Sequence, residues 1–443
     1  MSTQSAQWLA TARLLRRTGF GTTGPAVDAA VADSPESYLA RILDPARIVD
    51  DPGAKATPMP AFDTPTAPGK RADTGARKAY NTALSEQLQT LSQWWLDRMV
   101  QVHQPAVEKL TLLWHNHFAT SAAKVRQAAL MASQNQTLRD GCLGDFGDLA
   151  YAMLTDPAML HWLDGPQNTR KAPNENLSRE FMELFALGHG DGYTESDVRA
   201  GARALTGWTV KNGRAQLVAK RRDTGTKTFL GVTGDLDAAG YCDAVLAQPR
   251  SPGYVAGRLW QQLATDQPAS PAVLDRLTAA YGPNRDLRAL TVAILTDPQF
   301  VASPSSLVNT PVEWLVGLVR SLNIPVDASN SANTSNSRLV IQSLKVLGQK
   351  PFYPPDVGGW PRGQAWLSTA SAGVRLKTAT VLARKGDVST VADAAPGDRI
   401  DAAGYLLGIG SWSAQSAKAL RPLINRPPEL VAVAANTPEN LVT

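Results

Sequence analysis

The sequence predicts a mainly α-helical globular protein with one small β-hairpin insertion near residues 209–231. Apolar residues recur at helical spacing along most of the 443 residues. Only 209–231 departs from this pattern, with short Val-, Thr- and Phe-bearing pieces around Asn212-Gly213, a dipeptide typical of two-residue hairpin turns. Strands are too few for a parallel sheet, so we expect helices to form the core.

The chain divides into four predicted segments. Residues 1–50 carry two amphipathic patterns and are predicted as N-terminal helices. Residues 51–78 are rich in Pro, Ala and Thr without periodicity, which describes a linker or an irregular wrap. We expect a main helical domain over 79–380 and a partly helical C-terminal extension over 381–443.

Two short segments of the main domain echo each other. Residues 152–157 read Ala-Met-Leu-Thr-Asp-Pro and residues 293–298 read Ala-Ile-Leu-Thr-Asp-Pro. Each precedes a proline-started helix with Glu two residues after the proline. Either an internal duplication or common helix-ending chemistry explains the echo, because Thr-Asp-Pro often terminates helices.

Composition narrows the classes of function. The net charge of +5 and the pI near 9.1 allow an anionic ligand but do not indicate a nucleic-acid groove. Two cysteines without a C-x-x-C pair argue against a thiolate zinc site. No apolar run approaches the ~18 residues of a membrane span and no signal peptide is recognisable, so we expect a cytoplasmic chain.

The stretch Trp114-His115-Asn116-His117-Phe118 contains the first candidate site. On a continuous helix His115 and His117 lie 200° apart and cannot hold one ion. If the helix ends at Trp114, extended backbone places both imidazoles on one side, a usable spacing for a divalent metal. The alternative is that His117 caps the helix end and His115 is a half-buried structural histidine.

The second candidate is the polar face of the helix expected near 176–187. At 100° per residue Asn176, Arg179, Glu180 and Glu183 share one stripe. Two carboxylates three residues apart repel each other unless they share a cation, a proton or Arg179. The stripe is therefore either a solvated face with i,i+4 ion pairs or the wall of a polar site, and the residues alone favour neither.

Residues 352–366 form a loop rich in Pro, Gly and aromatic residues, which includes Asp356, Trp360 and Trp366. Exposed, its rings would provide a stacking platform for a sugar or another apolar-faced ligand. Buried, they would close one end of a helical bundle.

These motifs together resemble the bacterial family known as domain of unknown function 1800 (DUF1800). The resemblance runs from about Leu14 to Arg375. It rests on the Trp-His-Asn-His-Phe stretch and on Asn-Glu-Asn-x-x-Arg-Glu-x-x-Glu-Leu-x-x-Leu-Gly from Asn174. It rests further on Gly-x-Lys-Thr-Phe-Leu-Gly from Gly225, Gly-Gln-Lys-Pro-Phe from Gly348 and Pro-Pro-Asp-Val-x-Gly-Trp-Pro from Pro354. The resemblance implies no particular reaction. It does imply that many relatives are exported and accompanied by a sulfatase-like protein.

The motif blocks lead to the hypothesis that one pocket collects polar residues distant in sequence. Its members would be His115, His117, Arg179, Glu180, Glu183, Arg203, Asp223, Lys227 and Asp356, with Asn176 and Trp360 as further substrate contacts.

We expect an enzyme, a hydrolase or transferase acting on a polar substrate that is anionic or contains a sugar. Glu180, Glu183 and His115 would be its catalytic residues, while Arg179, Arg203 and other polar members of the pocket would bind substrate. His115 and His117 are the candidate ligands for a divalent metal. The alternative is a non-catalytic binding or assembly protein that contacts a partner enzyme through the 352–366 loop.

Overall fold

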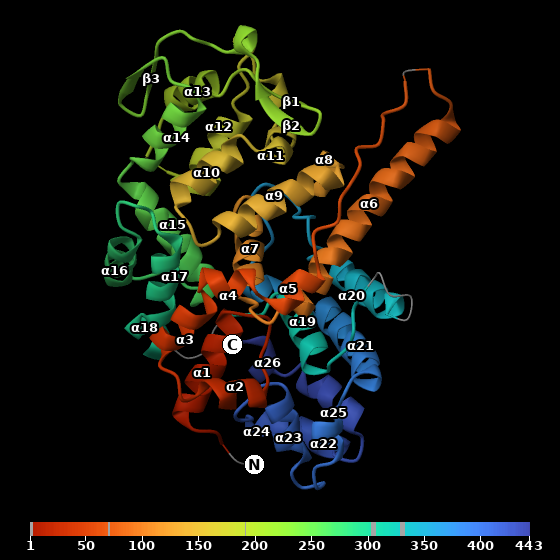
Figure 1. Ribbon diagram of the computed structural model, residues 1–443. Coiled ribbons are helices and arrows are strands. Elements are labelled where there is room, and N and C mark those ends of the chain that lie inside the picture. Colours follow the sequence, from red (N-terminus) through yellow and green to blue (C-terminus); the bar gives the residue numbers. More distant parts are fainter. Residues whose placement is uncertain (1–2, 70, 191, 303–306, 328–332) are drawn as a thin grey trace.

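The protein is built almost entirely from helices, as the computed structural model in Figure 1 shows. It describes residues 3–69, 71–190, 192–302, 307–327 and 333–443. Strands within these ranges form only two antiparallel two-stranded sheets. The predicted fold class is confirmed. Within the same ranges no helix is both long enough and apolar enough to cross a bilayer.

The N-terminal region folds into short helices, most of which begin at a Ser or Asp whose side chain accepts a backbone N–H bond. They are α1 (Ala6–Arg17), α2 (Gly24–Ala30), α3 (Pro35–Ile42), α4 (Pro45–Val49) and α5 (Pro52–Ala56). The segment after α5 runs beside α6 (Thr74–Gln101), where Gln87 Nε2 donates to Asp63 O over 3.0 Å. The segment thus lies along α6, and together they project outward from the body (Figure 1).

Helix α7 (Ala106–His117) lies between the two main apolar cores. Trp114 belongs to one core and Leu112 to the other. Every residue of α7 is buried except Asn116, which is half-buried. A helix enclosed on all sides holds its polar side chains in fixed surroundings, so those of α7 are the first to consider as functional groups.

The helices after α7 pack around it and lead to the polar stripe. They are α8 (Ala122–Val125), α9 (Ala128–Gly141), α10 (Phe146–Leu154), α11 (Pro157–Trp162), the turn η1 (Gly165–Gln167) and α12 (Asn176–Glu180). Helix α12 continues into a π-helix, η2 (Phe181–Ala186), rather than the uniform α-helix expected. Leu187 N bonds to Met182 O over 2.9 Å, five residues back. Such wider turns are frequently found at functional sites.

Residues 208–234 form two small sheets, a correction to the single hairpin expected. After α13 (Glu195–Ala204), β1 (Trp208–Lys211) pairs with β2 (Arg214–Leu217) through the predicted Asn212-Gly213 turn. The turn η3 (Ala219–Arg221) then leads to β3 (Lys227–Phe229), which pairs with β4 (Val232–Gly234).

The remaining helices complete the two apolar cores. They are α14 (Ala238–Leu246), α15 (Arg250–Leu263), α16 (Pro271–Tyr281), α17 (Leu287–Thr296), α18 (Pro298–Ala302), α19 (Pro311–Ser321) and α20 (Thr334–Val346). After the aromatic loop with its turn η4 (Gly363–Trp366) follow α21 (Thr369–Lys385), α22 (Ser389–Ala392), α23 (Arg399–Leu406), α24 (Ala414–Leu420), η5 (Arg421–Leu423), α25 (Pro427–Ala434) and α26 (Pro438–Leu441).

The two echoing segments occupy matching places in the fold. Each ends one helix and starts the next, α10 and α11 in the first copy and α17 and α18 in the second. The helix N-caps Asp145 and Asp286, separated by the same sequence offset as the echo, face each other in an antiparallel bridge. Two reciprocal bonds of 3.0 Å flank it, Phe146 N to Arg285 O and Leu287 N to Gly144 O. Self-pairing of equivalent positions is what a local twofold axis produces, and it favours the duplication explanation.

Candidate functional site

His115 lies in a closed aromatic cage. Its ring centroid is 5.4 Å from those of Trp95 and Phe352 and 5.5 Å from that of Trp360. Both ring nitrogens are buried without a hydrogen-bond partner in the described part of the chain. Burial lowers the pKa of His115 to about 3, so the ring is neutral.

His117 lies on the opposite side of α7. Its Nε2 donates to Phe185 O over 2.9 Å, and burial lowers its pKa to about 3. The metal hypothesis required the helix to end at Trp114, but α7 continues through His117 and separates the two rings. The described residues contain no group of three or more His, Cys, Asp or Glu side chains able to hold an ion.

Arg179 is the centre of an ion-pair cluster at the surface end of η2. Its guanidinium lies 3.0 Å from Glu175, 3.6 Å from Glu183 and 2.7 Å from Glu195. Glu183 also lies 3.4 Å from Nδ1 of the exposed His189. Arg179 therefore supplies the cation that the spacing of the carboxylates requires.

Glu180 stands apart from these ion pairs. Burial, followed by the negative charge of Glu183, raises the pKa of its half-buried carboxyl. Asn176 is exposed and donates weakly from Nδ2 to Asp164 over 3.4 Å. Of the stripe predicted from sequence, Arg179 and Glu183 are in contact, whereas Asn176 points to a different neighbour.

Arg203, Asp223 and Lys227 form a second cluster around the β-sheets. Arg203 Nε donates to Asp223 over 2.7 Å, and the buried Lys227 ammonium donates to the carbonyls of Asp223 and Gly225 and to Asp235. These bonds fasten the loop before β3. The charged groups of this cluster pair with one another and with nearby carbonyls, which indicates a role in holding the loop in place.

The aromatic loop is folded inward. Trp360 and Trp366 are 3% and 5% exposed, so they close the bundle end rather than present a stacking platform. Asp356 caps its own turn by accepting from Gly358 N over 2.8 Å. Trp360 N donates to Asn116 Oδ1 over 2.6 Å, which attaches the loop to the end of α7. The predicted site residues thus fall into several groups, each with its own contacts.

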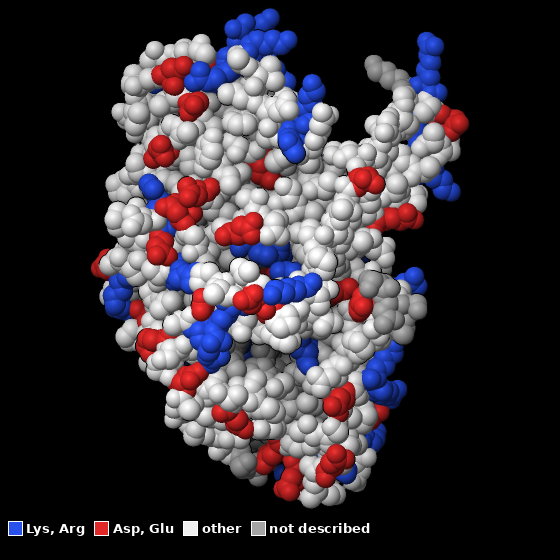
Figure 2. All heavy atoms as spheres, viewed as in Figure 1, with Lys and Arg blue, Asp and Glu red and all other residues white. Residues whose placement is uncertain are grey.

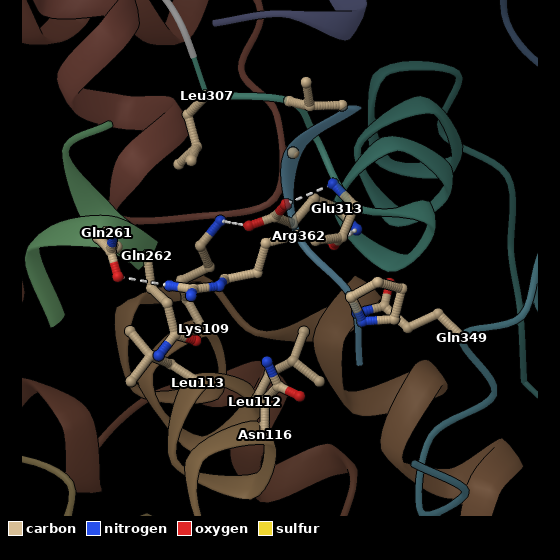
Figure 3. A pocket seen from close by; sticks show the side chains of 14 residues that line it. Lys109, Leu112, Leu113, Asn116, Gln261, Gln262, Leu307, Glu313, Gln349 and Arg362 are labelled. Carbon is tan, nitrogen blue, oxygen red and sulfur yellow. Dashed lines mark hydrogen bonds and ion pairs between the residues drawn. The ribbon is translucent and has the colours of Figure 1, made fainter. Parts of the chain in front are cut away.

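A different pocket does collect residues from separate motifs (Figure 3). It lies between α7, α15, the start of α19 and the aromatic loop, with a volume of about 60 Å³. Its polar lining consists of Lys109, Asn116, Gln261, Gln262, Thr310, Glu313, Gln349 and Arg362. Asn116 comes from the Trp-His-Asn-His-Phe stretch, Gln349 from Gly-Gln-Lys-Pro-Phe, and Arg362 directly follows the Gly-Trp-Pro motif.

A buried ion pair forms one wall of this pocket. Lys109 Nζ donates to Glu313 Oε1, and both side chains are at most one-tenth exposed. Burial lowers the pKa of Lys109 and would raise that of Glu313, but the attraction between the charges keeps the pKa of Glu313 below its usual range. Glu313 Oε2 also accepts from Thr310 N over 2.7 Å, which completes a capping box at the start of α19.

Arg362 enters the pocket from the other side. It donates to Gln261 Oε1 over 2.8 Å, the dashed line at the left of Figure 3. Burial, followed by repulsion from Arg258, lowers its pKa. Buried Nε of Arg258 has no partner in the described part of the chain.

Sequence reasoning missed this pocket. Glu313 was considered only as the Glu that follows a helix-starting proline, Gln349 only as part of a family motif, and Arg362 only as part of the 352–366 loop. A usable signal lies in α15, where Arg250, Tyr254, Arg258 and Gln261 recur at helical spacing on one face. Lys109 had a weaker signal, because it and its neighbour Glu108 place two charges in a mainly apolar stretch.

Comparisons with known proteins give a family but no characterised relative. No curated protein and no solved structure matched the chain. A family model described as "Protein of unknown function (DUF1800)" matches residues 13–442, nearly the whole chain. The protein therefore belongs to the DUF1800 family.

Proposed function

We propose that the protein binds a small anionic ligand, one bearing a carboxylate or phosphate group, in the pocket between Lys109 and Arg362. The observation that supports the proposal most is the meeting of two cationic side chains in one cavity whose lining contains a single carboxylate, Glu313. Glu313 already neutralises Lys109. The Arg362 charge is left for a ligand.

The surroundings preserve this excess of positive charge. Arg258 lies close enough to lower the pKa of Arg362, while Asp266 partly offsets it. Lys109, Arg258 and Arg362 against Glu313 and Asp266 leave one positive charge. An anion between the cations would relieve their mutual repulsion.

Amide donors complete the site. Within the described residues Asn116 Nδ2 and Gln349 Nε2 have no hydrogen-bond partner, although Asn116 Oδ1 and Gln349 Oε1 are engaged by backbone N–H groups. The oxygens are thereby held in place and the NH₂ groups are free to donate. A set of N–H donors beside cations suits carboxylate or phosphate oxygens.

The volume limits the part of the ligand that enters. A cavity of about 60 Å³ has room for a few waters or one small polyatomic anion. The pocket thus suits the charged head of a ligand.

Calorimetric titration tests this proposal. Phosphate, acetate and malonate would be titrated into the wild type and into Arg362→Gln, with Arg426→Gln, an exposed arginine elsewhere, as matched control. We expect saturable binding of at least one anion, weakened about tenfold or more by Arg362→Gln and unaltered by the control. Equal affinities in all three proteins would refute the site.

A catalytic function is the second candidate, and the raised pKa of half-buried Glu180 favours it. A carboxyl whose pKa is raised by burial and by a neighbouring carboxylate is a candidate general acid in a hydrolase or transferase. A panel of chromogenic phosphate esters, carboxylic esters and glycosides tests this. Turnover by the wild type that Glu180→Gln loses would support it, and turnover that Glu180→Gln retains would exclude Glu180.

A bound divalent metal, a sulfatase-like companion and a cytoplasmic location stay proposals. Metal analysis, co-purification and cell fractionation test them in turn. A partner surface formed by the aromatic rings of 352–366 has less support, because Trp360 and Trp366 are buried.

A further inference from the structure

A second, larger cavity opens on another side of α7. It has a volume of about 520 Å³ and lies between the short helices α4 and α5 and the helices α6, α9 and α17. Figure 2 shows Lys and Arg side chains gathered in the middle of this face, below α9 and above α4 and α5. The lining residues that matter here are cationic (Lys55, Arg98, Arg139, Arg288) or apolar (Pro45, Ile48, Val49, Val107, Leu143).

The floor of the cavity is a buried three-charge group. Glu108 is 1% exposed and accepts from Arg98 Nε over 2.5 Å and from Arg139 Nε and Nη2 over 2.8 Å each. Trp95 Nε1 donates to the same carboxylate over 2.8 Å. Burial alone would raise the pKa of Glu108, but the two guanidinium groups lower it to about 2. The group therefore has one net positive charge.

Further cations surround this floor. Arg288 donates from Nη1 to Leu43 O, and within the described residues its Nε and Nη2 have no partner. Lys55 pairs with Asp50 at 2.9 Å, and Asp140 accepts from Gln136. Counting Lys55 and Arg288 against Asp50 and Asp140 leaves the net charge at one positive.

The cavity also has an apolar wall. Helix α4 contributes Pro45, Ile48 and Val49 to the lining, and Val107 and Leu143 add further apolar side chains. Val49 is 72% exposed, unusual for a large aliphatic side chain. The lining therefore combines cationic and apolar side chains.

We propose that this cavity binds an amphipathic organic anion, with its carboxylate or phosphate head against Arg98 and Arg288 and its aliphatic body against α4. Arg98 Nη2, which has no partner among the described residues, and the free donors of Arg288 would bind the head. The apolar body would cover Val49. A volume of this size is typical of sites for small organic ligands.

Calorimetric titration with four probes tests both halves of this claim. Octanoate and octyl phosphate have head and body, octanol lacks the charge, and inorganic phosphate lacks the body. We expect saturable binding of one or both amphipathic anions, about tenfold tighter than that of octanol or phosphate. Octanol binding as tight as the anions would overturn the assignment, as would absence of binding by both anions.

Two variants locate the site. Val49→Glu places a negative charge on the apolar wall, and Val346→Glu alters an equally exposed valine on α20, 67% exposed, as matched control. We expect Val49→Glu to weaken binding about tenfold and Val346→Glu to leave it unchanged. Arg288→Gln should weaken the anions and not octanol. Unchanged affinity in both Val49→Glu and Arg288→Gln would refute the site.

The three-charge group of Glu108, Arg98 and Arg139 is left unmutated. Removing either arginine would leave the buried negative charge of Glu108 with one cation fewer and destabilise the fold. Circular dichroism of each variant establishes that it is folded. Trp94 lies over Arg98 and Arg139, at 6.0 and 5.4 Å from ring centroid to guanidinium carbon, so tryptophan fluorescence gives an independent readout. A fluorescence change that saturates with octyl phosphate but not with phosphate supports the site, and its absence while calorimetry detects binding places the ligand elsewhere.

Discussion

At the scale of single residues, the two histidines of α7 make stability depend on pH. Both have a folded-state pKa of about 3, lowered from 6.5 by burial. As pH falls below about 6.5 the unfolded chain takes up protons that the folded chain does not. Their stabilising contribution is complete above that pH and is lost progressively down to about 3.

We therefore expect the free energy of unfolding to fall between about pH 7 and pH 4.5. His115→Phe, which suits an aromatic cage, should lower this dependence by about 1 kcal/mol or more, because one buried imidazole is removed. Urea unfolding at both pH values measures it, with His103→Phe, an exposed histidine, as control. An equal pH dependence in His115→Phe and wild type would contradict the account.

Asp156 makes folding stability depend on pH in the opposite direction. Burial raises the pKa of this helix N-cap to about 7, despite the bonds it accepts from Met159 N and Gln134. A raised carboxyl pKa destabilises the folded state as pH rises from about 3.8 through 7.

Asp156→Asn keeps the accepting oxygen and removes the ionisation. At about pH 8 we expect it to be more stable than wild type by on the order of 1 kcal/mol, with the difference vanishing near pH 4. Thermal unfolding across this range checks it. A variant less stable than wild type at the higher pH would show that the ionised cap is favourable.

At the scale of elements, the contact between the aromatic loop and α7 determines the shape of the first pocket. Gly359 has φ +87°, and a Cβ there would lie 2.4 Å from Asn116 Oδ1 and 2.5 Å from Asn116 O. Gly231 has a similar φ of +83° but open space around it. Comparing alanine substitutions at these two glycines therefore separates the cost of backbone strain from the cost of steric contact.

Gly231→Ala should cost about 1 kcal/mol from backbone strain alone. Gly359→Ala should cost several kcal/mol, since the loop must also leave Asn116. Chemical denaturation of both variants measures the difference. Equal costs would mean that the loop is not held against α7 as described.

Local sequence patterns predicted elements well where one signal dominates. The Asn212-Gly213 turn forms as expected. The π-helix was not predicted, because the sequence of Phe181–Ala186 fits an α-helical pattern equally well. The wider turn depends on tertiary packing. The second sheet, with only three residues per strand, gives too short a pattern to detect.

At the scale of the whole molecule, some family motifs stabilise the fold and others line the first pocket. The Arg203 and Lys227 motifs fasten loops, and His115 with Trp360 fills a core. Their polar character suggested one site, but the sequence does not reveal which distant elements cover each side of a buried helix. That depends on packing among helices distant in the chain. The same packing brings Asn116, Gln349 and Arg362 together.

The central claim is that an anion binds between Lys109 and Arg362. The most direct measurement is anomalous diffraction from crystals of the wild type soaked in bromide or selenate. We predict an anomalous peak within hydrogen-bond distance of Arg362 and next to Asn116 or Gln349, absent in Arg362→Gln crystals. An empty pocket in wild-type crystals that show anomalous peaks at other basic side chains would contradict the account.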